Sequence, residues 1–173
     1  LINQKTSSYI YLNQATGERF VGLDDMGIND YLTPEFLQPR LDVIHNSTCV
    51  VIDSNLPEET IQWICNNFNG PIFAKAVSLV KTKRLISSLS KLNTLVINGV
   101  EAPVLTGITP NDKETSISCA MTLNNLGVEN VFLYVDEVGM LYQSKSERVF
   151  YPVNSVGVKN TNGDGAAATS GLV

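Results

Sequence analysis

The spacing of hydrophobic and polar residues changes along the chain and predicts a hairpin followed by alternating strands and helices. Residues 7–23, SSYIYLNQATGERFVGL, alternate between apolar and polar side chains around the turn NQATGE. This alternation is typical of a β-hairpin in which residues 9–12 pair with residues 19–23. The next segment predicts a helix that runs from Pro34 to His45, with Thr33 as its N-cap.

From residue 49 the pattern becomes regular. Short apolar runs predict buried strands at residues 49–53, 71–78, 94–98 and 130–136, and helical spacing separates them at residues 56–68, 80–92, 99–108 and 112–127. Leu85, Ile86 and Leu89 are expected on one buried helix face. We expect Pro103 to interrupt the helix at 99–108, and Gly127 to end the helix at 112–127.

This order of elements predicts an α/β fold. Strands that alternate with helices form right-handed crossovers, which give a mostly parallel central sheet flanked by helices on both faces. Short antiparallel strands are expected at residues 139–144, 147–153 and 155–160. No linker divides the chain, so we expect one domain, with the hairpin and its connection in residues 1–31 and the α/β core in residues 32–173.

Composition narrows the class of protein. The chain has 173 residues, of which 43% are hydrophobic, so a buried core is expected. Net charge of −5 argues against nucleic acid or an anionic membrane as a partner, and no apolar run approaches the roughly 20 residues of a membrane span. Three scattered cysteines indicate a reducing, cytoplasmic location. The absence of an initiator Met suggests a fragment.

Two polar residues follow the strand predicted at residues 94–98. Ligands of parallel sheets bind where the strands end, and here Asn98 ends a strand while Glu101 begins the next helix. One interpretation is structural, with Asn98 as a helix cap and Glu101 as an acceptor for backbone N–H groups. The other is a site in which both residues hold the water shell of Mg²⁺ near phosphates. Spacing alone does not choose between them.

The last residues, NTNGDGAAATSGLV at 160–173, form a Gly-rich turn that runs into a predicted helix start. Backbone N–H groups in such a turn can bind an anion or a phosphate. A terminal stretch of small residues is also typical of a tail without a function. Both interpretations are open on composition alone.

The segment TLVINGVEAPVLTGI, preceded by FAKAVSLVKTKRLISSLSKLN and followed by a helix, a strand and the Gly-rich turn, resembles the ribokinase/PfkB family of carbohydrate kinases. It is most similar to the pseudouridine kinase-like branch, and the opening hairpin resembles strands of the family's lid. The likeness covers essentially the whole chain. It implies a ribokinase-like fold, here an incomplete domain truncated at both ends.

The resemblance also implies an activity and a site. Kinases of this family use ATP and Mg²⁺ and transfer the γ-phosphoryl group to a sugar or nucleoside hydroxyl, largely by positioning and charge neutralisation. By resemblance, Asn98 and Glu101 lie near the phosphates, and Glu101 contacts the metal through water. Asp136 and Gly139 border the nucleotide. The anion hole of the family is matched by Gly163, Asp164 and Gly165.

Several positions depart from the family pattern. Ala166 stands where the family has its catalytic Asp, and Asp164 is a poor substitute because a carboxylate in the anion hole would repel the phosphate. Lys75 and Ala76 replace an Asp-Pro pair. We therefore expect impaired catalysis; the alternatives are a non-catalytic remnant that binds nucleotide or a protein, and an unrelated α/β ligand-binding module. Exposed sheet edges predict self-association into homo-oligomers.

Overall fold

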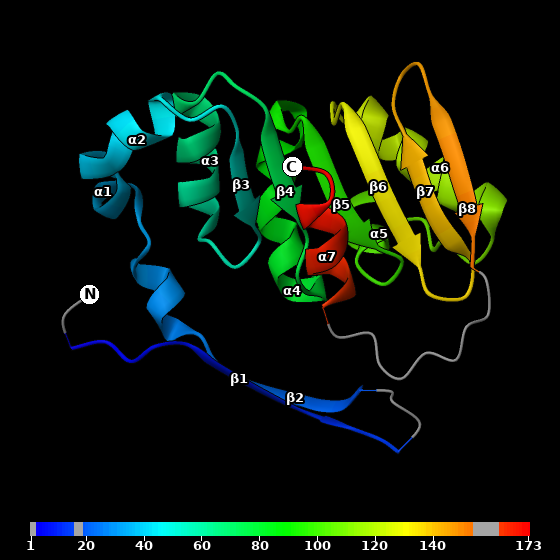
Figure 1. The fold of residues 1–173 in the computed structure, drawn as a ribbon, viewed down its shortest axis with the longest axis horizontal. Coiled ribbons are helices and arrows are strands. Elements are labelled where there is room, and N and C mark those ends of the chain that lie inside the picture. Colours follow the sequence, from blue (N-terminus) through cyan, green and yellow to red (C-terminus); the bar gives the residue numbers. More distant parts are fainter. Residues whose placement is uncertain (1–2, 16–18, 154–162) are drawn as a thin grey trace.

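A six-stranded sheet with the order β3-β4-β5-β6-β7-β8 forms the centre of the molecule (Figure 1). The computed structural model describes residues 3–15, 19–153 and 163–173. The strands are β3 (Val50–Asp53), β4 (Ile72–Lys75), β5 (Thr94–Asn98), β6 (Asn130–Val135), β7 (Gly139–Gln143) and β8 (Arg148–Pro152). Neighbours from β3 to β6 are parallel and the last two strands are antiparallel, which confirms the predicted mostly parallel sheet. The strand expected at 155–160 lies outside the described residues.

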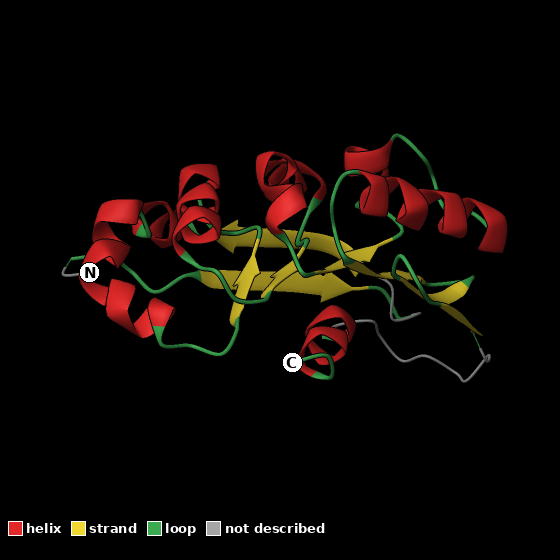
Figure 2. Ribbon diagram, turned by 90° about the horizontal axis from the view of Figure 1, so that it is seen from above, coloured by secondary structure: helices red, strands yellow, loops and turns green. Residues whose placement is uncertain are grey.

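Helices flank this sheet unequally. Figure 2 shows α3 (Glu58–Asn67), α4 (Leu79–Thr82), α5 (Ala102–Thr106) and α6 (Lys113–Asn125) on one face, and α7 (Asp164–Ser170) on the opposite face. The core lies under the larger group of helices, because alternate residues of the strands are buried there. Fully buried strand residues on this face include Ala74, Leu95, Ile97, Val131 and Leu133. None of the described helices is both long and apolar enough to cross a membrane.

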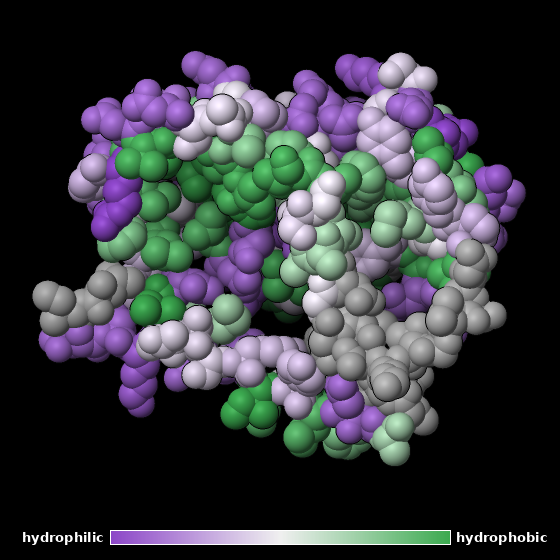
Figure 3. Space-filling view, viewed as in Figure 1, coloured by the Kyte–Doolittle hydropathy of each residue, from purple (hydrophilic) through white to green (hydrophobic). Residues whose placement is uncertain are grey.

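The N-terminal hairpin forms a separate two-stranded sheet that extends below the main one in Figure 1. It pairs β1 (Ser8–Asn13) with β2 (Arg19–Asp25) in antiparallel register, as the alternation predicts. Large apolar side chains on both strands are exposed, and Figure 3 shows hydrophobic residues on this part of the surface. Ile10, Phe20 and Leu23 are 64%, 72% and 65% exposed, so the hairpin buries little of its own apolar surface.

The helix predicted from Pro34 to His45 is broken, so the prediction of one continuous helix was wrong. The chain forms α1 (Pro34–Leu37), a 3₁₀ turn η2 (Gln38–Arg40) and α2 (Leu41–His45). Thr33 does cap α1, since its hydroxyl oxygen accepts the backbone N–H of Phe36 at 3.3 Å. The break falls at Pro39, which has no N–H to donate and crowds the preceding turn. Before α1 lies a further 3₁₀ helix, η1 (Gly27–Tyr31).

The helix predicted at residues 80–92 also differs in geometry. After α4 the chain continues as the 3₁₀ helix η3 (Lys83–Lys91). Leu85 and Leu89 are buried as predicted, but Ile86 is 52% exposed, so its placement on the buried face was wrong. A 3₁₀ helix has about 3.0 residues per turn, so Leu85 shares its face with the buried Ser88. This period does not by itself explain why Ile86 faces solvent.

Pro103 and Gly127 mark helix ends in different ways. Pro103 lies in the first turn of α5, where the missing N–H costs nothing, so it starts this helix instead of interrupting it as predicted. Gly127 follows α6 with a left-handed φ of 105° and ends it, as expected.

Candidate functional site

Four strand ends and the beginning of α7 meet at one edge of the sheet. Asp53, Lys75, Asn98 and Val135 are the last residues of β3, β4, β5 and β6. Since these strands are parallel, their carboxyl ends lie side by side, in the position where such sheets bind ligands. α7 packs against β4 and β5, so residues from the end of the chain lie next to the ends of these two strands.

Asn98 shapes the turn between β5 and α5. Its side-chain Oδ1 accepts the backbone N–H groups of Val100 at 3.0 Å and Glu101 at 2.7 Å. In return, the Glu101 Oε2 atom accepts the backbone N–H of Asn98 at 3.4 Å. Asn98 therefore closes a turn after β5 and does not cap α5, whose N-cap residue is Glu101, so the interpretation of Asn98 as the helix cap was wrong. The interpretation of Glu101 as an acceptor for a backbone N–H group is correct, and these contacts hold its carboxyl at the strand end.

Glu101 is a buried acid with little compensation. Its side chain is 4% exposed, and burial raises the pKa of its carboxyl, while the Asn98 N–H and the positive charge of Lys75 oppose that shift. The hydrogen bond at 3.4 Å is long for an N–H···O contact. A buried carboxylate with one weak donor favours a nearby cation or ordered water.

The described residues fit Mg²⁺ only as an ion that keeps most of its water. They contain no group of three or more His, Cys, Asp or Glu residues that could hold a metal directly. Glu101 offers a carboxylate without a strong donor, whereas Asn98 Oδ1 already accepts two N–H groups. Mg²⁺ binds proteins through few oxygens and retains several waters, so Glu101 suits the water-mediated contact expected from the sequence.

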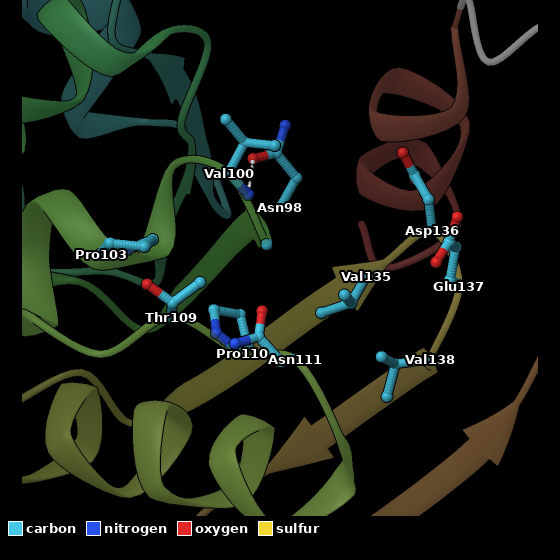
Figure 4. A pocket seen from close by; sticks show the side chains of 11 residues that line it. Asn98, Val100, Pro103, Thr109, Pro110, Asn111, Val135, Asp136, Glu137 and Val138 are labelled. Atoms are coloured by element: carbon cyan, nitrogen blue, oxygen red, sulfur yellow. Dashed lines mark hydrogen bonds between the residues drawn. The ribbon is translucent and has the colours of Figure 1, made fainter.

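A cavity of about 550 Å³, which we call the Asn98 cavity, opens between the turn after β5 and the turn after β6 (Figure 4). Asn98 and Val100 form one side, and Asp136, Glu137 and Val138 face them from the end of β6. The rest of the wall consists of Gly99, Pro103, Thr109, Pro110, Asn111 and Val135. The structure thus brings Asn98 and Asp136 to one cavity that both polar and apolar side chains line.

Gly139 has a structural reason to be glycine. Its φ of 141° is in the region that side chains rarely adopt, and a Cβ atom there would overlap the Tyr151 carbonyl oxygen across the β7–β8 pair. Gly139 does not line the Asn98 cavity. Its proposed contact with nucleotide remains a prediction.

α7 begins after Gly163, which has a left-handed backbone conformation, and it approaches β4 closely at Gly165. Gly163 has a φ of 91° and precedes the first helical residue, Asp164, whose side chain lies outside the described part of the structure. A Cβ built on Gly165 would lie 2.6 Å from both Lys75 Cε and Tyr134 Oη. Gly165 therefore allows α7 to approach the ends of β4 and β6, which a larger residue would obstruct.

A second cavity of about 590 Å³, the Lys75 cavity, lies between α7 and the ends of β3 and β4. Ala166, Asp53, Lys75 and Thr169 contribute to its wall. Ala166 is exposed, and its methyl group cannot accept a proton. Sequence reasoning did not select Lys75 or Asp53 as site residues. Asp53 ends the strand predicted at residues 49–53, which was an available signal, whereas Lys75 lies inside the strand predicted at residues 71–78 and ends β4 only in the structure.

Comparison with known proteins places this geometry in a family. The model of the pfkB family of carbohydrate kinases matches residues 2–173. Pseudouridine kinase of Escherichia coli is 32% identical over 171 residues, which are 98% of this chain and 55% of that protein. The chain spans about half the length of the curated relatives it matches.

Solved structures share the fold. The ribokinase of Arabidopsis thaliana in complex with ribose and ATP superposes with a TM-score of 0.73 at 18% identity, covering 98% of this chain and 57% of that one. Ribokinase from Thermotoga maritima gives a TM-score of 0.70 at 20% identity, over 95% of this chain and 56% of that chain. The predicted ribokinase-like arrangement is confirmed.

Proposed function

Because the chain belongs to the pfkB family of carbohydrate kinases, we propose that it serves ATP-dependent transfer of a γ-phosphoryl group to a hydroxyl group of a sugar or nucleoside. The observation that carries this proposal is the meeting of Asn98, Glu101 and the glycines at the start of α7 at one sheet edge. These parts are far apart in sequence. Phosphoryl transfer needs such an assembly, since it is catalysed by positioning and by neutralising charge.

Each part has a proposed role. The base and ribose of the nucleotide bind in the Asn98 cavity, between the turn after β5 and Asp136. Glu101 orients water around Mg²⁺, which when bound neutralises charge on the phosphates. The backbone N–H groups of residues 163–165 form the anion hole, where Gly163 provides the left-handed turn and Gly165 the close approach. Gly139 borders the nucleotide in this proposal, and its lack of a side chain lets β8 pair closely with β7.

The acceptor is proposed from similarity. Identity of 32% to a pseudouridine kinase makes pseudouridine the first acceptor to test, with ribose as the second. Both carry the alcohol group that this reaction phosphorylates.

One observation favours a second function. Ala166 lines the Lys75 cavity where the family's catalytic Asp is expected, and it has no group that can accept the hydroxyl proton. Asp164, the poor substitute, is the only acid in residues 163–173. The alternative is a non-catalytic module that binds nucleotide, or a protein partner, at the same edge.

Thermal shift and turnover assays separate these functions. Stabilisation by ATP with Mg²⁺, together with phosphorylation of pseudouridine or ribose, supports the kinase. Stabilisation without turnover supports the nucleotide-binding module. The absence of any nucleotide effect contradicts both the kinase and the nucleotide-binding module, and leaves the module that binds a protein.

Self-association and location belong to the same proposal. The exposed Ile10, Phe20 and Leu23 of the hairpin favour contact between copies of the chain, and a Phe20→Ser variant should then elute later than the wild type in size-exclusion chromatography. Elution of both at the monomer volume would contradict this.

The free cysteines, of which Cys65 and Cys119 are buried, fit a reducing cytoplasm where ATP is available.

A further inference from the structure

We propose that Lys75 binds the terminal phosphate of the nucleotide and so distinguishes a triphosphate from a diphosphate. This inference rests on the proposed function and adds a residue to it. Lys75 ends β4, which is the neighbour of β5 in the sheet and contacts α7. It stands at a position where the resemblance implies an acidic residue, so the family pattern assigns it no such role.

The side chain of Lys75 reaches the beginning of α7. A Cβ built on Gly165 would lie 2.6 Å from Lys75 Cε and 3.2 Å from its Nζ. The ammonium group therefore lies against the backbone of the helix that provides the proposed anion hole. Gly165 leaves the space that the lysine tip occupies.

The ammonium group of Lys75 is poorly paired. Among the side chains and backbone groups that the structure describes, its one hydrogen bond is to the Ala76 carbonyl oxygen at 3.2 Å. It forms no ion pair within 4.0 Å in that part of the chain. An ammonium has three N–H donors, so a half-buried lysine with one weak bond retains capacity for an anion.

Among the acids whose side chains the structure describes, those near Lys75 are used elsewhere or form no ion pair with it. Asp53 is the in-register neighbour of Lys75 on β3, but its two carboxylate oxygens accept the backbone N–H and side-chain amide of Asn55 at 2.8 and 3.1 Å. The charge of Lys75 does reach Glu101, where it opposes the rise in the carboxyl pKa that burial causes. The Lys75 ammonium and the Glu101 carboxyl thus lie in one site without forming an ion pair. The ammonium is available to a phosphate, and the carboxyl to a hydrated cation.

The position of Lys75 selects the last phosphate. Lys75 lines the cavity that contains Ala166 and does not line the Asn98 cavity. A nucleotide whose base lies in the Asn98 cavity would extend past Glu101 to residues 163–165, where the Lys75 side chain lies against Gly165. The group nearest Lys75 is then the terminal phosphate, on the side where an acceptor hydroxyl would approach.

The test compares nucleotides with and without that phosphate. Calorimetric titrations with Mg²⁺ would measure binding of ADP and of a non-hydrolysable ATP analogue to the wild type, Lys75→Met and Lys75→Arg. Loss of a charge-assisted contact weakens binding by about 10- to 100-fold. We expect that loss for the ATP analogue in Lys75→Met, an ADP affinity within about twofold of wild type, and retention of most analogue affinity in Lys75→Arg.

Lys145→Met is the matched control. Lys145 is exposed in the turn after β7, and Gln143 at the end of β7 pairs with Val131 near the start of β6, so this turn lies at the opposite edge of the sheet. This variant should bind both nucleotides as the wild type does. Equal losses for ADP and the analogue in Lys75→Met, or no loss for either, would overturn the inference while the wild type still bound nucleotide. A wild type that bound neither would overturn the proposed function, and the role of Lys75 with it.

Discussion

Burial of Glu101 outweighs the opposing charge of Lys75, so the Glu101 carboxyl has a raised pKa although a lysine from the neighbouring strand lies close enough to affect it. The two side chains form no ion pair within 4.0 Å in the part of the chain that the structure describes. The ionised form of this buried carboxyl is therefore energetically unfavourable. Perturbed pKa values of this kind cluster at functional sites.

The first prediction concerns Glu101 and pH. A carboxyl whose pKa is raised on folding binds its proton more tightly in the folded state, so the wild type loses stability as pH rises from 4.5, the ordinary value, through the raised value. Glu101→Gln removes this loss and should be more stable than wild type at pH 7, with a smaller difference at pH 4. Urea unfolding at both pH values measures it.

Glu147→Gln, at an exposed position, controls for the change in net charge. A Glu101→Gln variant that is less stable than wild type at pH 7, or a difference that does not change with pH, would contradict this description of the site.

The second prediction tests which residues of η3 are buried, because the structure exposes Ile86 where the sequence predicted it to be buried. Leu85 is fully buried and Ile86 is 52% exposed. Leu85→Ala should cost about 2–5 kcal/mol of unfolding free energy, because it leaves a cavity in the core. Ile86→Ala should cost less than about 1 kcal/mol, as surface substitutions do. Chemical denaturation of both variants measures the difference, and equal losses would mean that the helix buries the face predicted from the sequence.

The third prediction separates structure from ligand binding at Gly139. Its left-handed backbone and the nearby Tyr151 carbonyl leave no room for a Cβ atom. Gly139→Ala should therefore destabilise the protein by about 1–3 kcal/mol, whether or not nucleotide is present. Gly27→Ala is the control, since nothing lies within 4 Å of its Cβ position. If Gly139→Ala unfolds like wild type but loses nucleotide affinity, its main role is in binding.

The fourth prediction restores the missing base. Ala166 lines the Lys75 cavity beside Lys75 and Asp53. If catalysis is limited by the absence of a proton acceptor, Ala166→Asp should raise phosphorylation of pseudouridine by about 100-fold or more, since general base catalysis contributes roughly 10² to 10⁴. Ala167→Asp places the same charge on the next, exposed helix position and should have no such effect. Equal rates for the two variants would mean that the base is not the limiting group.

Sequence reasoning predicted the architecture because the apolar periods of β3 to β6 and their helices are regular and local. It failed where local geometry departs from an ideal α-helix: Pro39 breaks one segment, and η3 is a 3₁₀ helix in which Ile86 is exposed. These outcomes depend on how each turn packs on the sheet, which residue spacing does not determine.

The candidate site was predictable in part. Asn98 and Asp136 could be selected because each ends a predicted strand, and Glu101 because it lies in the first turn of the next predicted helix; the structure brings Asn98 and Asp136 to one cavity. Lys75 was noted only as a departure from the family pattern. Its importance depends on contact with Gly165, some ninety residues later in the chain. Contacts between segments so far apart require the fold.

In the proposed function, a nucleotide binds at the carboxyl ends of the parallel strands, between α7 and the turns that follow β5 and β6. Backbone NMR of the labelled chain titrated with ADP and Mg²⁺ tests it most directly. We predict shifts of the amide signals at Asn98, Glu101, Asp136 and Gly165. We predict none at Gly70, which lies just before the start of β4, or at Lys145, both at the opposite end of the strands. Shifts confined to that opposite end or to the hairpin, or no shifts at saturating nucleotide, would contradict this proposal.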